Sequence, residues 1–405
     1  MELYTENNNY KSNNYKLYQG NMLDMSEVIE PCSIDSIVTD PPYELNFMGK
    51  GWDNAGISFQ KETWEKCYEV LKPGGYLLAF GGSRTFHRIA CAIEDAGFEI
   101  RDTIMWLYGS GFPKSMNIGK KIEKWKGWGT ALKPSFEPII VARKPFKGSL
   151  VDNVIQYGVG GLNIDECRVG TEERTYKGCG KSNVGFIGGS FENGSKEDIK
   201  YTAQGRFPAN TILTYDDTDF DEVCGGFPIG KKNGSITKKY KMNNQVYGEY
   251  GYCNTWEAYN DSGSASRYFM NCKYTGKDEE IKRYIYTPKA SKKDRNEGLD
   301  VFEEKINCDR NVECYSADVP FNRSANPKKN THPTVKPTEL MQYLVRLVTP
   351  NNGIVLDPFN GSGSTGKAVM YENKERDKNY KYIGIELEPE YLNISKARLD
   401  FIIKR

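Results

Sequence analysis

The chain of 405 residues is long enough for two or three domains of ordinary size. Its 55 basic and 54 acidic side chains give a formal net charge of +1, which excludes an overall electrostatic attraction to nucleic acid and leaves only local basic patches. The 27 Tyr and 18 Phe exclude a disordered composition, although the mean hydropathy of -0.66 is somewhat polar.

The first 145 residues alternate between strand and helix patterns. Strand character at 15–18 and 34–39 is followed by an amphipathic stripe with i, i+3, i+4 and i+7 spacing, formed by Trp64, Cys67, Tyr68 and Leu71. A turn at 72–75 precedes a buried strand at 76–80, and a helix near 84–95 and strands near 98–106 and 137–142 continue the pattern. This alternation predicts an α/β sheet.

The alternation stops near residue 145, where Gly, Asn, Ser and Tyr become dominant and no sustained helical period is visible. It resumes at Pro337 with a helix, a strand at 353–357, a Gly-rich turn, a second helix, a strand at 382–386 and a final helix from Pro389. We therefore expect one three-layer α/β domain built from residues 1–145 and 331–405, with residues 146–330 inserted between its halves.

The motif Asp40-Pro41-Pro42-Tyr43 directly follows the strand at 34–39, at the sheet edge where open α/β folds bind ligands. Two prolines remove two N–H donors, so backbone carbonyls lie beside one carboxylate and one aromatic ring. Asp40 and a proline carbonyl can accept both hydrogens of an exocyclic amino group while Tyr43 stacks on the heterocycle. An ordinary Asp-Pro turn closing a strand is the alternative.

A second motif, DPFNGSGSTG, runs from a strand at Asp357 into a Gly-rich turn at a helix start. It resembles a phosphate-binding loop only in part, because Ala368 stands where the hydroxyl ligand of Mg²⁺ must be. Asp357 suits a ligand with a positive amine, and Glu386, at the end of the next strand, has the spacing of a ribose-binding acid. Ribose and ammonium without polyphosphate favour S-adenosylmethionine over NAD or ATP.

The ten Cys are scattered without a CxxC pair, and there are only two His. This predicts neither a disulfide framework nor a metal site, and it favours a reducing, cytoplasmic environment. The longest apolar runs fall far short of the about 20 residues that cross a bilayer, and the amino-terminal 14 residues contain no apolar signal core, so we expect neither membrane association nor secretion.

Together, DPPY and the FxGxG segment resemble the amino-DNA methyltransferases, which methylate adenine N6 or cytosine N4. Their order along the chain resembles the β class, in which the DPPY half comes first, a target-recognition region follows and the Gly-rich cofactor half is last. The resemblance implies a circularly permuted, Rossmann-like methyltransferase fold that uses S-adenosylmethionine. It implies catalytic roles for Asp40, Pro41, Pro42 and Tyr43, and cofactor contacts by Asn21, His332, Lys336, Asp357, Phe359, Gly361, Gly363, Thr365 and Glu386.

Two parts of this assignment follow particular family motifs. The segment HPTVKP, from His332 to Pro337, is similar to the family's cofactor-side motif and is expected to close over the methionine end. The segment 71–82 is similar to the strand and turn that line the target-base pocket. The family often has Gly-Asp near the first strand, whereas this chain has Gly20-Asn21, which departs from the usual carboxylate role.

Basic patches in the inserted region are the candidates for contact with DNA phosphates. They comprise Lys238, Lys239 and Lys241 in one segment, and Lys289, Lys292, Lys293 and Arg295 in another. A solvated charged face is the alternative interpretation of either patch.

These observations predict a site-specific methyltransferase that flips a base out of double-stranded DNA and methylates adenine N6 by direct in-line transfer. Asp at the first DPPY position favours adenine, while cytosine N4 stays an alternative. A non-catalytic DNA-binding module on the same fold and an amino-methyltransferase acting on RNA also stay open, as do a homodimer and a cognate restriction endonuclease.

Overall fold

The computed structural model of the chain describes residues 1–7, 15–45, 56–108, 115–178, 199–214, 229–232, 243–244, 248–249, 261–264, 270–271, 290–305 and 329–405. The chain divides into two compact units. The first comprises Met1–Glu166, Asn210–Asp216 and Asn271–Arg405, and the second comprises Cys167–Ala209 and Asp217–Met270. The second unit therefore lies within the expected insertion, 146–330, whereas the described residues 146–166 and 290–305 belong to the first.

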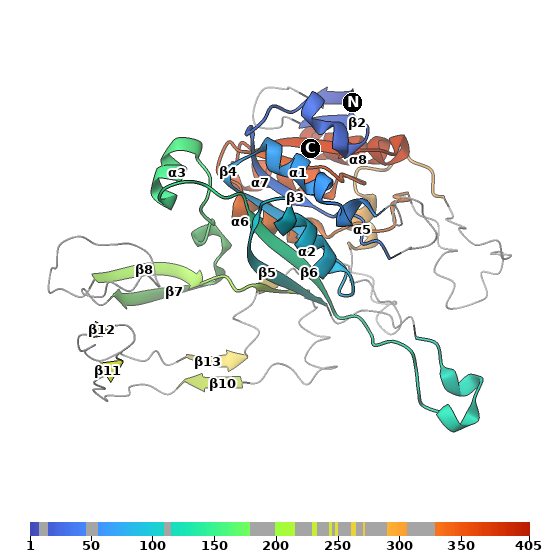
Figure 1. Cartoon of the computed structure of the whole chain (residues 1–405), viewed down its shortest axis with the longest axis horizontal. Helices are drawn as coiled ribbons and strands as arrows, with labels where there is room; N and C mark the ends of the chain where they lie inside the picture. Colours follow the sequence, from blue (N-terminus) through green and yellow to red (C-terminus); the bar gives the residue numbers. More distant parts are fainter. Residues whose placement is uncertain are drawn as a thin grey trace. The chain divides into compact units, whose positions relative to one another are not determined.

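A ten-stranded sheet with the order β1-β2-β16-β15-β3-β4-β6-β5-β9-β14 dominates the described residues (Figure 1). Its strands are β1 (Glu2–Asn7), β2 (Tyr15–Gln19), β3 (Ile34–Thr39), β4 (Leu71–Phe80), β5 (Glu99–Tyr108), β6 (Phe136–Arg143), β9 (Thr211–Thr214), β14 (Met270–Asn271), β15 (Ile354–Asp357) and β16 (Lys381–Glu386). The strands from β2 to β4 run parallel, while β6 runs antiparallel to both β4 and β5.

The carboxy-terminal strands enter the sheet between strands of the amino-terminal half. Tyr382 of β16 pairs with Tyr15 of β2, and Val355 of β15 pairs with Ser36 of β3. This arrangement confirms the predicted Rossmann-like α/β class and the predicted split of the sheet between the two ends of the chain. It also places a topological switch point between β15 and β3, because β15 continues through a helix to β16 on one side and β3 continues to β4 on the other.

Helices cover both faces of the sheet. They are α1 (Lys61–Val70), α2 (Phe86–Asp95), α3 (Leu150–Tyr157), α5 (Lys292–Asn296), α6 (Thr338–Val348), α7 (Ser364–Arg376) and α8 (Pro389–Lys404), with short 3-10 turns η1 (Met22–Glu27), η4 (Ile57–Phe59), η5 (Ile118–Lys120), η6 (Glu123–Trp125) and η7 (Asp165–Cys167). Helices α1 and α2 pack with the sheet in one apolar cluster, while α6, α7 and α8 contact β2, β3, β4, β15 and β16 and pack against each other. Every residue of β3 is buried, as expected for a strand covered on both faces.

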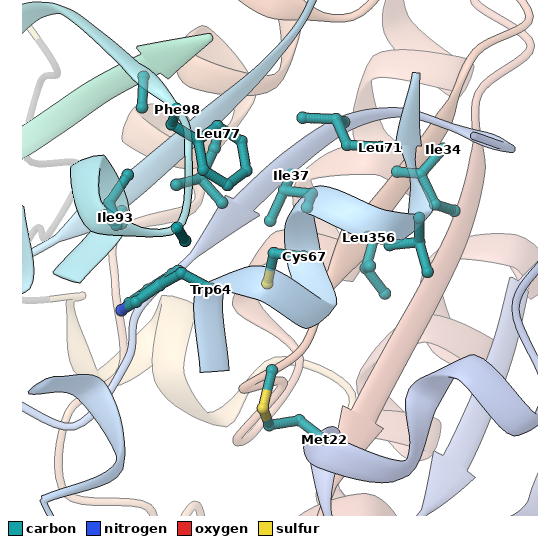
Figure 2. Packing of buried hydrophobic residues seen from close by; sticks show 14 of the residues in the cluster. Met22, Ile34, Ile37, Trp64, Cys67, Leu71, Leu77, Ile93, Phe98 and Leu356 are labelled. Atoms are coloured by element: carbon teal, nitrogen blue, oxygen red, sulfur yellow. The ribbon is translucent and has the colours of Figure 1, made fainter. Parts of the chain in front are cut away.

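Figure 2 shows the cluster on the α1 and α2 face. Trp64 and Cys67 of α1 belong to one cluster with Ile37 of β3, Leu77 of β4 and Leu356 of β15. The helical stripe predicted from the sequence therefore faces this core. The cluster joins residues from both ends of the chain, so neither half of the sheet buries this face alone.

Two local predictions were wrong. The turn expected at 72–75 lies within β4, because Gly74 has a φ of 82° and the backbones of Gly74 and Gly75 exchange hydrogen bonds of 2.9 Å with Lys144. Helix α3 occurs just after residue 145, where no sustained helical period was expected. Its eight residues are too few to show a period, but Ser149 caps its start and Gly158, with a φ of 73°, ends it.

The described part of the second unit consists of antiparallel strand pairs. The longest pair joins β7 (Val169–Gly178) to β8 (Ile199–Arg206). The shorter pairs join β10 (Ile229–Lys232) to β13 (Asp261–Ser264), and β11 (Asn243–Asn244) to β12 (Gly248–Glu249). Among all described residues of the chain, no helix has the length and apolar character needed to span a bilayer.

Candidate functional site

The two motifs singled out in the sequence meet at the carboxyl edge of the sheet. The DPPY residues follow β3 and the Gly-rich turn follows β15, its neighbour, at the switch point. Thr39, the last residue of β3, donates a hydrogen bond of 2.7 Å to Oδ1 of Asp357. The tertiary structure therefore joins, through one side-chain contact, residues that are more than 300 positions apart in the sequence.

A buried ammonium group lies among the DPPY side chains. The side chain of Lys336 is 1% exposed, and its Nζ forms an ion pair with Oδ2 of Asp40 and lies 3.6 Å from Oε2 of Glu137. The hydroxyl of Tyr43 donates a hydrogen bond of 2.9 Å to the same oxygen of Glu137. The Lys336 Nζ also lies 5.2 Å from the centre of the Tyr43 ring and 4.7 Å from that of Phe80, within range of cation–π attraction.

This cluster carries two carboxylates and one ammonium, and one of its carboxylate oxygens is left to accept a hydrogen bond. Oδ1 of Asp40 is inaccessible to solvent in this structure and has no hydrogen-bond partner among the described residues. Burial, together with the charges of Asp40 and Glu137, raises the pKa of Tyr43 well above its usual value, so its phenol stays neutral. The arrangement can receive an N–H donor at Asp40, next to a neutral aromatic ring.

The rest of the DPPY segment supports this geometry. Pro41 is buried and Pro42 is partly buried. Thr85 donates a hydrogen bond of 2.9 Å to the carbonyl oxygen of Tyr43. A Cβ atom placed on Gly82 would lie 3.3 Å from the Tyr43 ring, so the backbone at the end of the 71–82 segment approaches the ring closely, and the role of this segment as the wall of a base pocket stays a prediction.

Asp357 holds the Gly-rich turn in place. It is buried, and its carboxylate accepts hydrogen bonds from the Thr39 hydroxyl, from the Phe359 backbone at 3.1 Å and from the Thr365 hydroxyl at 2.7 Å. Burial raises its pKa to about 6, although these hydrogen bonds act in the opposite direction. The hydrogen bonds described for Asp357 and Thr365 are thus made to other groups of the protein. Contact of these two residues with the cofactor stays a prediction. Phe359 is partly buried against Trp64, with 6.5 Å between ring centroids.

Glu386 joins the end of β16 to the Gly-rich turn. Its Oε2 accepts a hydrogen bond of 2.6 Å from the backbone of Gly361, and its Oε1 accepts one of 2.9 Å from Glu388. Burial raises its pKa to about 7. The backbone of Gly20 donates to the Glu386 carbonyl at 3.0 Å, and Asn21 caps η1 through a bond of 3.1 Å to Leu23. Asn21 and Glu386 are therefore brought to the same edge.

His332 packs directly on the glycine loop. Gly361 has a φ of 51°, and a Cβ added to it would lie 2.8 Å from Nε2 of His332. The imidazole ring contacts Tyr391 edge-on, with 4.6 Å between centroids. Burial and the neighbouring Arg295 lower the pKa of His332 to about 3, so the ring is neutral at ordinary pH. Gly363, with a φ of 73°, is similarly crowded, because an added Cβ would lie 2.3 Å from the Ser395 hydroxyl.

The lysine after the glycine loop is occupied by other contacts. Lys367 is fully buried, and its Nζ lies 2.5 Å from Oδ1 of Asp294 and 2.8 Å from Oε2 of Glu297. This placement agrees with the rejection of a phosphate-binding loop, whose lysine would face the ligand. Arg398 belongs to the same network and donates a bond of 2.6 Å to the Ser362 carbonyl. Helix α5 is thereby tied to the glycine loop.

The predicted basic residues separate into three groups. Lys238, Lys239, Lys241 and Lys289 lie outside the described residues. Lys292 and Lys293 are exposed on α5, and the Nζ of Lys292 lies 3.9 Å from Oε1 of Glu304. Arg295, on the same helix, donates a hydrogen bond of 2.6 Å to the carbonyl oxygen of His332, so its guanidinium supports the HPTVKP segment.

Glu137 is the residue of this cluster that the sequence interpretation missed, and Lys336 lies beside Asp40 rather than only on the cofactor side. One signal for Glu137 was present in the sequence. An acidic side chain stands second in the strand FEPIIVAR, followed by five apolar residues, and a buried charge requires a partner. The register places it at the site, because Phe80 at the end of β4 pairs with Ile139, two residues further along β6.

The family model described as "DNA methylase" matches residues 34–397. The Type II methyltransferase M.HindIII of Haemophilus influenzae is 34% identical over 115 residues, which cover 25% of this chain and 37% of the relative. M.HpaI of Haemophilus parainfluenzae is 34% identical over 109 residues, 25% of this chain and 34% of the relative. The chain therefore spans about a third of the length of these curated relatives.

Among solved structures, the cytosine-N4-specific PvuII DNA methyltransferase is similar with a TM-score of 0.43 and 14% sequence identity. That alignment covers 97% of this chain and 92% of the other.

Proposed function

Because the chain belongs to the DNA methylase family of N6 and N4 methyltransferases, whose model spans residues 34–397, we propose that it methylates an exocyclic amino group of a base in double-stranded DNA. Adenine N6 is the preferred target. Enzymes of this family use S-adenosylmethionine, and membership in it confirms the predicted cofactor. The single observation that carries the proposed chemistry is the buried, unpartnered Oδ1 of Asp40 beside the ring of Tyr43.

An aryl amine is a poor nucleophile, because its nitrogen lone pair is delocalised into the ring. Two acceptors that hold both amino hydrogens would free this lone pair, and Oδ1 of Asp40 and the Pro41 carbonyl are the proposed pair. An amine that accepts a methyl group also gains positive charge. The carboxylates of Asp40 and Glu137 would stabilise that charge until a proton is released.

The residues around the glycine loop are chemically suited to the cofactor. The carboxylate of Glu386 accepts backbone N–H groups from Gly361, Leu387 and Glu388, and its remaining lone-pair capacity can accept a hydroxyl of a ribose. We propose that Glu386 holds the ribose and that Phe359 and the backbone around Gly361 and Gly363 hold the remainder. When bound, S-adenosylmethionine supplies an electrophilic methyl group.

The target base must leave the duplex to reach Asp40, and Tyr43 is proposed to replace the stacking that the base loses. Tyr43→Phe keeps the stacking face but loses the bond to Glu137, so we expect it to retain more activity than Tyr43→Ala. With 2-aminopurine at the target position, binding should raise fluorescence. Equal activity of the two variants would contradict a stacking role.

The test of the function is expression of the full chain in a host without DNA methylases, followed by modification-sensitive sequencing and mass spectrometry of digested DNA. N6-methyladenine in a fixed sequence context is expected, and the Asp40→Ala variant is the matched control. N4-methylcytosine would reassign the base. Cofactor binding without a modified base would favour a non-catalytic DNA-binding module, and methylation confined to RNA would reassign the substrate.

We further propose that target recognition lies within residues 146–330, with Lys238, Lys239, Lys241, Lys289, Lys292 and Lys293 as candidate phosphate contacts. The relatives named above are Type II methyltransferases, which favours a cognate restriction endonuclease as a partner of this system. A homodimer is the proposed alternative to a monomer, and sedimentation velocity of the purified chain would distinguish them.

A further inference from the structure

A basic arm, which we define as residues 115–135, connects β5 to β6 and was not among the predicted DNA-binding segments (Figure 1, teal). It contains five lysines and one glutamate, a net charge of +4, so the other residues of this +1 chain together carry −3. All five lysines are exposed: Lys120, Lys121, Lys124, Lys126 and Lys133. The arm is therefore a local basic segment of a nearly neutral chain.

The arm has defined internal structure. The hydroxyl of Ser115 accepts hydrogen bonds from the backbones of Thr130 at 2.9 Å and Ala131 at 3.2 Å, and the Thr130 hydroxyl accepts one from Met116 at 2.9 Å. The backbone of Ile118 donates to Trp128 at 3.0 Å. These bonds close the segment into a loop across its own base, so it presents its side chains in a preformed arrangement, with less entropy to lose on binding.

Several large apolar side chains of this arm are exposed to solvent. Trp125 and Trp128 contact each other edge-on, with 5.0 Å between ring centroids, yet Trp128 is 60% exposed. Leu132 is 92% exposed, and Met116 and Ile122 are also exposed. Two tryptophans interleaved with lysines form the combination that binds nucleic acid, because aromatic faces stack on bases or sugars while ammonium groups contact phosphates.

The arm ends at the rim of the proposed catalytic site. The backbone of Tyr108, at the end of β5, donates a hydrogen bond of 2.9 Å to the carbonyl of Ser135, and its hydroxyl donates one of 3.5 Å to Oε1 of Glu137. The last residue of the arm is therefore two positions from the carboxylate that contacts Tyr43 and Lys336. A duplex whose flipped base enters this site must pass over the same edge of the sheet.

From charge, aromatic exposure and position together, we propose that the basic arm binds duplex DNA beside the flipped base. Its lysines contact backbone phosphates, and Trp128 packs on a sugar or an unstacked base. This inference rests on the proposed function, since it takes DNA as the substrate. It assigns a contact surface in the first unit, independent of the inserted basic patches.

The experiment measures affinity for a fluorescein-labelled, mixed-sequence duplex against salt concentration, with the full chain. Lys124→Ala/Lys126→Ala should lower the log-log salt slope by about 1.8, or about 0.9 for each lost phosphate contact. Lys374→Ala/Lys381→Ala is the matched control, because these lysines are also exposed but lie at the opposite edge, near the end of α7 and at the start of β16. The control should keep the parental slope.

A second pair of variants tests the aromatic contact. Trp128→Ala should weaken binding about tenfold at constant salt, whereas Trp128→Phe should keep most of the affinity. Since Lys124, Lys126 and Trp128 are exposed and lie outside the core, cofactor affinity should be unchanged in every arm variant.

Parental salt slope and affinity in the arm variants, with methylation intact, would overturn the arm proposal and leave the proposed function standing. Arm variants that lose self-association in sedimentation experiments but keep the parental salt slope would also overturn the arm proposal. That result would show that the arm binds a second copy of the chain. A parental protein that binds no duplex and modifies none would instead refute the proposed function.

Discussion

Removal of the buried ammonium of Lys336 is the perturbation with the most direct structural consequence. Lys336→Met keeps a side chain of similar length but leaves Asp40 and Glu137 facing each other without a counter-charge. Breaking a buried ion pair by removing one partner costs about 3–5 kcal/mol of unfolding free energy. The Glu137 side chain is 7% exposed, but that of Asp40 is 17% exposed and gains some hydration, so we expect about 3 kcal/mol, the lower end of this range.

The measurement is urea unfolding followed by circular dichroism, supported by thermal melting. The double variant Lys336→Met/Glu137→Gln should recover roughly 1–2 kcal/mol of the lost unfolding free energy, because it removes one of the two negative charges that repel each other. The Gln side chain can still accept the hydrogen bond from the Tyr43 hydroxyl. Lys378→Met is the control. It breaks a more exposed ion pair of 2.7 Å with Glu166 and should change stability by less than about 1 kcal/mol. An unfolding free energy of Lys336→Met equal to the parental value, or a further loss in the double variant, would refute this account of the cluster.

Three further predictions address Asp40, the proposed catalytic carboxylate, then the glycine loop, and then Glu386, the proposed ribose-binding acid. Asp40→Ala should lower methyl transfer by about 10²–10³ or more while calorimetry shows unchanged cofactor affinity; near-parental turnover would remove Asp40 from the mechanism. Gly361→Ala should destabilise the protein and weaken cofactor binding, because the added Cβ would lie 2.8 Å from His332. Gly158→Ala is the control for backbone strain alone, since Gly158 has a similar φ but open space around it. Equal losses of unfolding free energy in the two variants would refute the packing argument. Burial raises the pKa of Glu386 from 4.5 to about 7, so between these pH values the folded state binds a proton that the unfolded state releases. The parent should therefore lose stability relative to Glu386→Gln as pH rises from about 4.5 to 7, by at most roughly 3 kcal/mol. A stability difference between the two proteins that does not change with pH would contradict this prediction.

The strands and helices around the motifs were predictable because their signals are local. The stripe of Trp64, Cys67, Tyr68 and Leu71 has a helical period, and that helix is α1, ending at Val70. The strand before Asp40 has β-branched residues at Ile34, Ile37 and Val38, and all six of its residues are buried. Both chemical motifs directly follow strands, so their place at the carboxyl edge follows from sequence once the sheet is parallel. Helix α3 and the irregular start of β4 escaped this reasoning, because a short helix shows no period and a glycine turn can also lie inside a strand.

Tertiary structure alone decided which charges meet. Nothing in the order of the chain indicates that Lys336 would lie between Asp40 and Glu137, because their contact depends on how β3, β6 and the HPTVKP segment come together at one edge. The same holds for His332, whose position over Gly361 depends on the bond from Arg295 of α5. Sequence patterns report the exposure and period of each element by itself. The pairing of buried charges follows from strand register and from the free-energy penalty of leaving a charge unpaired away from water, and both exist only after the elements have packed.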